Sequence, residues 1–378
     1  MKPSERLLSL DVFRGITIMG MILVNNPGTW SAIYPPLEHA KWNGCTPTDL
    51  IFPFFLFIVG VAISYSLSKR KAQGGDMKSL YLNIFRRTAI LFGLGLILSG
   101  FPFGLLFGHQ FSLSTLRIPG VLQRIAVVYM ISSVLFLSTN TKFQYWFTGS
   151  ILVIYAMLMS FIPVPGIGHA NFEPTTNLSA WLDRLILGNH IWSGSKFWDP
   201  EGILSTLPAI GSAMLGIFTG NWLRSEKDQT TKTVWLFVWG SILMVAGWVW
   251  DGWFPINKNL WTSSYVLYTA GLALNFLAFC YWFIDVKKIT WWIKPFQVYG
   301  MNAITVFFLS GIVGRIMYMV KWETADGTVV TIKDYLFNTF FLSWLQPINA
   351  SLAWAIVYIL FWLGLMWILY AKKIFIKV

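Results

Sequence analysis

The sequence predicts an all-α fold, namely a polytopic membrane bundle of about ten transmembrane helices with both termini cytoplasmic. Of the 378 residues, 56% are hydrophobic and only 12% are charged, whereas a soluble domain carries roughly 25% charged residues. Apolar runs of about 20 residues recur along the chain, which is the length that a spanning helix needs. The 21 tryptophans fit aromatic belts at the two membrane interfaces.

The apolar stretches that are predicted to span the membrane are separated from one another by polar or charged segments. In chain order they are 8–26, 47–68, 81–100, 118–138, 145–163, 203–222, 233–250, 261–284, 296–319 and 350–372. Two of the intervening segments are long, 164–202 and 320–349, and long loops in compact proteins often carry function. No repeat divides the chain, so residues 1–378 are predicted to form a single domain.

The distribution of basic residues sets the predicted orientation. With a cytoplasmic N-terminus, the inner segments include Lys287, Lys288 and Lys294 and the tail residues Lys372 and Lys373, and they outnumber the outer basic residues. Excess Lys and Arg collects in cytoplasmic loops. The loop between the first two spans is therefore predicted to face outside.

Composition also narrows the function classes. The net charge of +12 is explained by cytoplasmic loops against a lipid bilayer, so nucleic acid is not an expected partner. Cys45 and Cys280 give neither a disulfide framework nor metal-ligand spacing. The sequence has no phosphate-binding glycine loop, zinc signature or Gly-x-Ser-x-Gly elbow, and no metal is expected.

The polar stretch 36–53 holds His39, one of only four histidines, between two predicted spans, and Asp49 lies just inside the second span. The unperturbed pKa of histidine is close to neutrality, so a histidine at a membrane surface is a candidate proton carrier. The alternative is a histidine that only hydrogen-bonds its loop. Asp49 is likewise either a helix cap, favoured by the helix dipole, or a functional carboxylate.

Several basic and amide side chains occur inside or at the ends of predicted spans, where charge is costly. They are Arg14, Arg86, Arg87, Gln123 and Arg124. Arginine forks suit phosphates, so these residues form a candidate anion site; the alternative is snorkelling to lipid phosphate. Asp11 is three residues before Arg14 and can pair with it.

The outer loop 164–202 places aromatic side chains beside carboxylates and amides, as in Trp198-Asp199-Pro200-Glu201. A carbohydrate site uses this combination, and ordinary interfacial tryptophan is the alternative. Residue chemistry alone thus indicates a membrane protein with polar sites on both faces, which describes a transporter as well as an enzyme.

Six groups of segments, in order from the first predicted span to the ninth, carry a more specific pattern. They are 8–17 with 23–26, 38–60, 117–126, 199–210, 254–266 and 299–304. The most specific are Glu38-His39-Ala40-Lys41-Trp42-Asn43-Gly44 and the segment that begins at Asp199-Pro200-Glu201-Gly202. In these segments the chain resembles the transmembrane acyltransferase family that includes heparan-α-glucosaminide N-acetyltransferase and its bacterial homologues.

The resemblance implies transfer of an acetyl group from cytosolic acetyl-CoA to the amino group of a terminal glucosamine, on a heparan sulfate-like saccharide at the outer face. In the family the histidine of the Glu-His-Ala motif is catalytic, and this residue is His39 here. The asparagine of the Val-Asn pair that closes the first span is also implicated, and this residue is Asn25 here. We expect His39 to act as the general base and Asn25 to donate to the thioester oxygen. Asp49 is expected to orient His39.

The resemblance also implies two binding regions. The CoA nucleotide is expected at the inner face, on Arg14, Arg86, Arg87, Gln123 and Arg124, although Arg124 falls nearer the outer end of its span. The acceptor is expected to enter from outside. The residues predicted to contact it are Glu38, Trp42, Asn43, Asp199, Glu201, Asp251, Asn257, Lys258 and Trp261.

Some alternatives stay open. The chain lacks the N-terminal lumenal region of the lysosomal enzyme, so its native acceptor is undetermined, and a bacterial inner membrane is the expected location. The family also allows a homodimer. O-acetylation of a periplasmic glycan, a ping-pong route through acetyl-His39 and an amino-sugar transporter remain competing interpretations.

Overall fold

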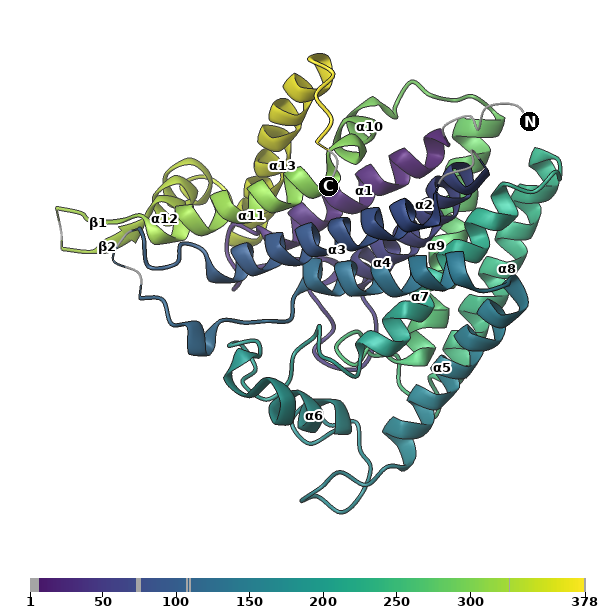
Figure 1. Ribbon diagram of the computed structural model, residues 1–378. Coiled ribbons are helices and arrows are strands. Elements are labelled where there is room, and N and C mark those ends of the chain that lie inside the picture. Colours follow the sequence, from purple (N-terminus) through teal and green to yellow (C-terminus); the bar gives the residue numbers. More distant parts are fainter. Residues whose placement is uncertain (1–6, 73–75, 107, 109, 326, 377–378) are drawn as a thin grey trace.

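The computed structural model describes residues 7–72, 76–106, 108, 110–325 and 327–376, which fold almost entirely into helices (Figure 1). The long helices are α1 (Leu8–Asn25), α2 (Ile51–Ala72), α3 (Met77–Gly100), α4 (Val121–Ser138), α5 (Thr141–Phe161), α7 (Thr206–Leu223), α8 (Gln229–Trp250), α9 (Ser263–Cys280), α11 (Ala303–Met319) and α13 (Pro347–Ala371). The short helical elements named below are η2 (Pro47–Leu50), α6 (Leu178–Leu187), η5 (Tyr281–Val286), α10 (Lys294–Met301) and α12 (Ile332–Phe337). Strands β1 (Lys321–Glu323) and β2 (Val329–Thr331) pair antiparallel.

The predicted polytopic helical bundle is confirmed. Eight of the described helices are long and apolar enough to cross a membrane, and the bent pair α10–α11 makes a ninth. The difference from about ten lies at α7, which occupies the predicted span 203–222 but is not one of the eight. Glycines and polar side chains lower the hydropathy of α7. They are tolerated there because most of α7 is buried inside the protein and does not face lipid.

Helices α2 and α7 approach each other closely enough to explain those glycines. A Cβ atom at Gly60 on α2 would lie 1.9 Å from the carbonyl oxygen of Ala213, and one at Gly216 on α7 would lie 2.1 Å from that of Phe57. Any side chain at either position would force the two helices apart. Helix α7 therefore forms the inner wall of the bundle and not a lipid-facing one.

The predicted span 296–319 is broken at Asn302, where α10 and α11 meet at 81°. The Asn302 side chain donates to the carbonyl oxygen of Ile374 (3.1 Å) and accepts from the N–H of Ile376 (2.9 Å). These bonds hold the C-terminal tail against the break. The break was not predicted because the stretch is mostly apolar and the tail that stabilises the break lies 72 to 74 positions away in the sequence.

The two ends of the chain lie on the same side of the bundle. Figure 1 places N and C at its upper side, and α6 with its flanking loops at the lower side. At the N-terminal end of α1, the N–H groups of Leu8 and Ser9 donate to the Asp285 carboxylate in η5. The even number of predicted spans also places both ends on one side; the cytoplasmic assignment of that side, which rests on the loop charges, remains a prediction.

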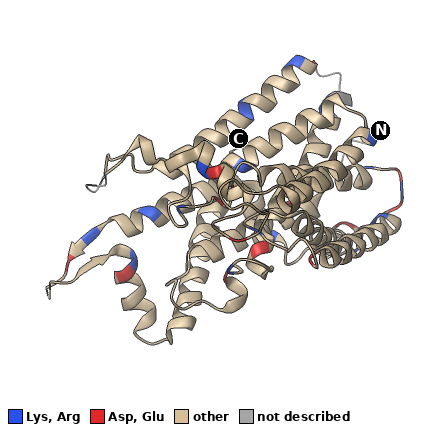
Figure 2. Ribbon diagram, turned by 90° about the horizontal axis from the view of Figure 1, so that it is seen from below, with Lys and Arg blue, Asp and Glu red and all other residues tan. Residues whose placement is uncertain are grey.

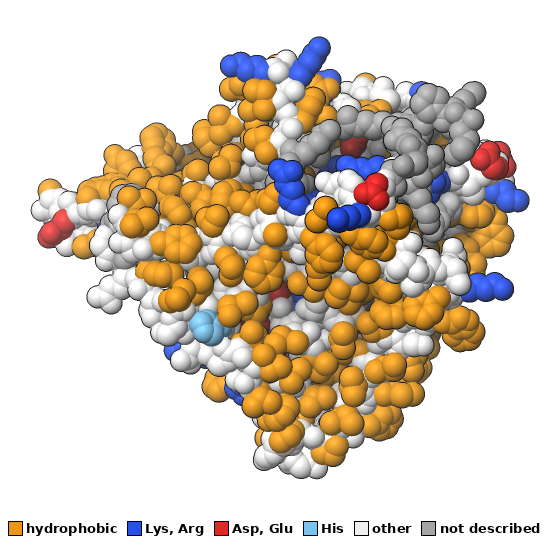
Figure 3. Space-filling view, viewed as in Figure 1, with side chains coloured by type: hydrophobic (Ala, Val, Ile, Leu, Met, Phe, Trp, Pro, Cys, Tyr) orange, Lys and Arg blue, Asp and Glu red, His pale blue; other side chains and the backbone are white. Residues whose placement is uncertain are grey.

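The surface has the character that a lipid environment requires. Figure 2 shows few charged residues along the helices, and Figure 3 shows a face covered mainly by hydrophobic side chains. Trp146 and Trp291 are 77% and 86% exposed, which would be unfavourable in water. Polar chemistry is therefore confined to the loop regions and to a few buried clusters.

Candidate active site

Asp49 is the third residue of the short helix η2, and its carboxylate anchors the His39 loop. Its Oδ2 accepts hydrogen bonds from the N–H groups of Ala40 and Thr46, both 3.0 Å long, and from the Thr46 hydroxyl. The side chain is 1% exposed. These bonds cap the helix and leave the other oxygen, Oδ1, directed at His39. Asp49 therefore caps a helix and contacts the histidine at once.

His39 lies against that free oxygen, with Nδ1 2.6 Å from Asp49 Oδ1. Its side chain is 47% exposed, so a substrate can reach the ring. A carboxylate at one ring nitrogen holds the proton there and makes Nε2 the basic nitrogen of the ring. The spacing in sequence could not show this contact, which the fold of residues 40–48 creates.

Lys258 completes the cluster from a distant part of the chain. Its Nζ lies 3.0 Å from Nδ1 and 3.2 Å from Nε2 of His39, and 3.7 Å from Asp49 Oδ1. Burial lowers the pKa of Lys258, while the Asp49 and Glu201 carboxylates favour its charged form. The cluster thus combines an acid, a base and an ammonium.

The segment 251–262 fixes the His39 loop in place. The Gly44 N–H donates to the carbonyl oxygen of Ile256 (2.7 Å), and the Asn257 amide donates to Asn43 Oδ1 (3.0 Å). Gly44 has φ of +102°, a conformation that favours glycine. Burial raises the pKa of the neighbouring Cys45 to about 12, so this thiol stays protonated and is not a competing nucleophile.

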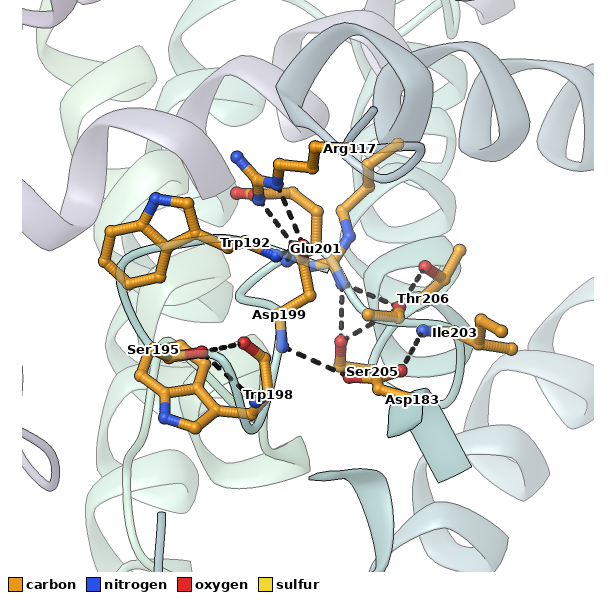
Figure 4. A network of polar contacts seen from close by, with 12 residues as sticks. Arg117, Asp183, Trp192, Ser195, Trp198, Asp199, Glu201, Ile203, Ser205 and Thr206 are labelled. Atoms are coloured by element: carbon orange, nitrogen blue, oxygen red, sulfur yellow. Dashed lines mark hydrogen bonds and ion pairs between the residues drawn. The ribbon is translucent and has the colours of Figure 1, made fainter. Parts of the chain in front are cut away.

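A second cluster lies in the outer loop region, where Arg117 binds two carboxylates (Figure 4). Its Nε and Nη2 donate to Asp199 (2.8 and 2.6 Å), and Nη2 also donates to Glu201 (2.6 Å). Burial disfavours the charge of Arg117, but the hydrogen bonds and charges of these two carboxylates outweigh it and raise its pKa. Asp199 also accepts from the Trp192 N–H (2.9 Å), so its oxygens are occupied.

The base of this cluster contains two further buried ions. Asp183 accepts from the N–H groups of Ile203 and Asp199, yet burial raises its pKa to about 6. Arg124 is 2% exposed, donates to Gly202 O and the Ser205 hydroxyl, and lies over the Trp261 ring. Arg124 is thus enclosed by the protein and bonded to the loop that precedes α7.

Arg117→Met is expected to destabilise the protein by about 3–5 kcal/mol, because it leaves two buried carboxylates without their partner. The measurement is the thermal unfolding midpoint of the purified protein in detergent. The matched control is Arg184→Met, since Arg184 donates to two backbone carbonyls in an exposed setting. Equal midpoints for Arg117→Met and Arg184→Met would contradict the structural role of Arg117.

A large cavity of about 800 Å³ opens beside the chain ends. Four arginines line it: Arg14, Arg70, Arg86 and Arg87. Arg87 lies 4.8 Å over the Tyr129 ring, and its buried Nε has no hydrogen-bond partner in the part of the chain that the structure describes. Three of the five residues predicted to hold the CoA nucleotide therefore meet in one cavity. Gln123 and Arg124 do not line it.

A smaller cavity of about 330 Å³ contains Asn25 and Gln123 together with Arg117 and Arg315. Helices α1, α3, α4 and α11 contribute residues to both cavities. On each helix, the residues of the small cavity lie toward the end away from the arginine cavity. The two cavities therefore lie one behind the other along the same four helices, with Arg117 joining the smaller one to the outer loops.

The remaining predicted acceptor residues fall into two groups. Trp42 meets the Trp198 ring at 5.1 Å and donates to Phe172 O, while Glu38 is exposed beside His39. Trp261 is 1% exposed and Asp199 is enclosed by its partners, so neither offers a surface to a saccharide. Asp251 is exposed and accepts from the Ile256 N–H (2.6 Å), which stabilises the turn below Lys258.

From sequence, Arg70 is a candidate for the anion site with lipid phosphate as its favoured partner, and in the structure it lines the cavity. Arg315 as a cavity residue and Arg117 as the centre of an ion-pair cluster were missed. Arg117 precedes Pro119-Gly120 at the start of α4, but nothing local indicates its partners, which lie more than 80 positions away in the chain. Only the preference of a buried arginine for carboxylates pointed toward the acidic pair in the loop 164–202.

Comparison with known proteins gives consistent matches. A family model described as heparan-alpha-glucosaminide N-acetyltransferase, catalytic, matches residues 6–248. A heparan-alpha-glucosaminide N-acetyltransferase from Mus musculus is 30% identical over 425 aligned positions, covering 99% of this chain and 61% of the relative. One from Homo sapiens is 31% identical and is covered to 60% of its length. The chain thus spans about three fifths of the length of these curated relatives.

Proposed function

The chain belongs to the heparan-alpha-glucosaminide N-acetyltransferase family, and on this premise we propose that it transfers the acetyl group of acetyl-CoA to the amino group of a terminal glucosamine. The observation that carries the proposal is the contact of His39 with Asp49, 2.6 Å long, in an accessible outer loop. This pair supplies the base that an ammonium acceptor requires before its nitrogen can attack a thioester.

We place the nucleotide of acetyl-CoA in the arginine cavity. Arg14, Arg70, Arg86 and Arg87 supply cationic forks for its phosphates. On α1, Arg14 and Asn25 are eleven residues apart, which corresponds to about 16 Å of helix. The pantetheine arm would follow this helix, so that the thioester reaches the smaller cavity at Asn25. Arg124, bonded to Gly202 and Ser205 elsewhere, is left out of the phosphate site.

We place the acceptor saccharide against the His39 loop. Asn43 is exposed there and is held by the buried Asn257, and Trp42 with Trp198 forms an aromatic surface of the kind that sugar rings stack on. Glu38, Glu201 and Lys258 supply charges around the bound amine. Asp199, Asp251 and Trp261 are assigned to the support of this surface rather than to direct contact.

Lys258 has a defined part in this scheme. Its ammonium lies at His39, so an incoming glucosamine ammonium meets a like charge, which lowers the pKa of the acceptor. His39 Nε2 then takes the proton of the nitrogen, while Asp49 accepts a hydrogen bond from Nδ1. His39 passes this first proton to water. The neutral nitrogen then bonds to the carbonyl carbon, the C–S bond breaks and the CoA thiolate leaves, while His39 takes the second proton of the nitrogen and passes it to the thiolate.

Asn25→Ala is expected to lower the turnover number roughly 100-fold, because one donor to the developing oxyanion is lost. The Michaelis constant for acetyl-CoA should change little, since Asn25 does not line the arginine cavity. Steady-state kinetics with both substrates varied separates the two constants. An unchanged turnover number would remove Asn25 from the chemistry. Asn189→Ala is the control, because Asn189 is exposed and lines neither cavity.

The function itself is tested by incubating purified protein with labelled acetyl-CoA and glucosamine-terminated saccharides. The proposal predicts a product that is stable to mild hydroxylamine, because an amide resists this reagent and an ester does not. A labile product would favour O-acetylation. Saccharide uptake into vesicles without any dependence on acetyl-CoA would favour an amino-sugar transporter. Labelled protein in the absence of acceptor would favour the acetyl-His39 route.

A further inference from the structure

Gln123 is a buried amide whose hydrogen-bonding capacity is unused in the scheme above. Its side chain is 4% exposed, and its Nε2 has no hydrogen-bond partner among the described residues. It lines the same 330 Å³ cavity as Asn25. A buried N–H group without a partner is costly, so a ligand in this cavity is expected to supply the missing acceptor.

The surrounding backbone is built to seat this amide. A Cβ atom at Gly95 on α3 would lie 2.2 Å from Gln123 Oε1, and one at Gly120, just before α4, would lie 2.6 Å from the same atom. Any side chain at either position would displace the amide. Gly93, one helical half-turn from Gly95, has open space in place of such a contact. The close approach of the backbone is therefore found at the two glycines that contact the Gln123 amide and not at Gly93.

The other polar groups of the cavity restrict what the ligand can be. Arg117 is held by Asp199 and Glu201, so it is not free to bind an anion. Arg315 donates to Gly311 O and adds positive potential. A neutral amide donor in a positive cavity suits a carbonyl oxygen that gains negative charge during the reaction.

We propose that Gln123 Nε2 donates a second hydrogen bond to the carbonyl oxygen of the acetyl thioester and, with Asn25, completes an oxyanion hole. The proposal rests on the acetyl transfer proposed above. When the amine nitrogen bonds to the carbonyl carbon, the C=O electron pair moves onto the oxygen, where both amides stabilise it. When the C–S bond breaks, the pair re-forms the carbonyl and the CoA thiolate departs.

The first test replaces the amide directly. Gln123→Leu and Gln123→Glu both remove the N–H donors, and each is expected to lower the turnover number roughly 100-fold. The Michaelis constant for acetyl-CoA is expected to stay within about threefold, because ground-state binding relies on other residues. A turnover number within about threefold of the wild-type value in both variants would overturn the proposal.

A spectroscopic readout separates this role from a structural one. Infrared spectra of acetyl-CoA labelled with ¹³C at the carbonyl are recorded with the His39→Ala protein, which holds the substrate without turnover. The carbonyl band is expected at lower frequency than in free acetyl-CoA. It should move back toward the free value when Gln123→Leu is added. An unmoved band would overturn the donor role, even if activity were lost.

A second pair of variants leaves Gln123 itself intact. Gly95→Ala is expected to reproduce the loss of turnover by displacing the amide, whereas Gly93→Ala should retain wild-type turnover. Normal turnover in Gly95→Ala would overturn the proposed seating. The failure of the proposed function is distinguishable, since in that case the wild-type protein transfers no acetyl group. Transfer by wild type with unaffected Gln123 variants rejects the oxyanion hole alone.

Discussion

His39→Ala is expected to lower acetyl transfer by roughly 100- to 10,000-fold, the range over which a positioned general base contributes. The expectation follows from the geometry: Nδ1 is held by Asp49 at 2.6 Å, and the ring is 47% exposed. Among the described residues, no other histidine contacts Asp49 or Lys258. The Michaelis constant for acetyl-CoA should be nearly unchanged, because His39 lines neither cavity.

The matched control is His169→Ala, which removes an exposed histidine from the outer loop. Its turnover should equal that of the wild type. Transfer at the wild-type rate by the His39 variant would leave the protein an acetyltransferase but remove His39 from its chemistry. Acetyl label retained on the wild-type protein, and lost in His39→Ala, would instead identify the histidine as the nucleophile.

Asp49→Asn is expected to lower the turnover number by roughly 100- to 10,000-fold while leaving the fold intact. The asparagine keeps the shape of the side chain but reverses one hydrogen bond, so the histidine is held in the wrong tautomer. The same change in a Ser-His-Asp triad lowers turnover about 10⁴-fold. Turnover and the thermal midpoint are to be measured on the same preparation.

Asp76→Asn is the appropriate comparison for this variant. Asp76 is the N-cap of α3 and accepts from the N–H groups of Lys78 and Ser79, whereas Asp49 accepts from the N–H of the N-cap residue Thr46. Asparagine is about as good an N-cap as aspartate. Asp76→Asn should therefore leave activity unchanged. If Asp49→Asn also left activity unchanged, Asp49 would be only a helix-capping residue.

The bundle could be predicted from sequence because spanning helices are recognised by their length and hydropathy, which are local properties of the sequence. The two features of the fold that differed from the prediction depend on tertiary contacts. Helix α7 holds glycines and polar residues because its neighbours enclose it, and the chain breaks at Asn302 because the C-terminal tail bonds there. Neither partner is adjacent in sequence, so hydropathy alone carried no signal for them.

The candidate site was predictable in part for the same reason. His39, Asn25 and Asp49 stand in motifs, and Arg14, Arg86 and Arg87 stand where charge is costly, so each residue draws attention by itself. The contacts of the site could not be predicted in this way, because their partners are far apart in sequence. Lys258 contacts His39 across 219 positions, and Arg117 contacts Asp199 across 82. A buried Trp261 and a fully bonded Asp199 look the same in sequence as exposed saccharide ligands.

The central claim is that the acetyl group passes from the arginine cavity at one end of four helices to the acceptor at the other. The direct measurement encloses a glucosamine-terminated saccharide inside proteoliposomes and adds labelled acetyl-CoA outside, with His39→Ala vesicles as the control. The account predicts N-acetylated saccharide inside wild-type vesicles and none in the control. Product formed only when both substrates are on the same side of the membrane would contradict it.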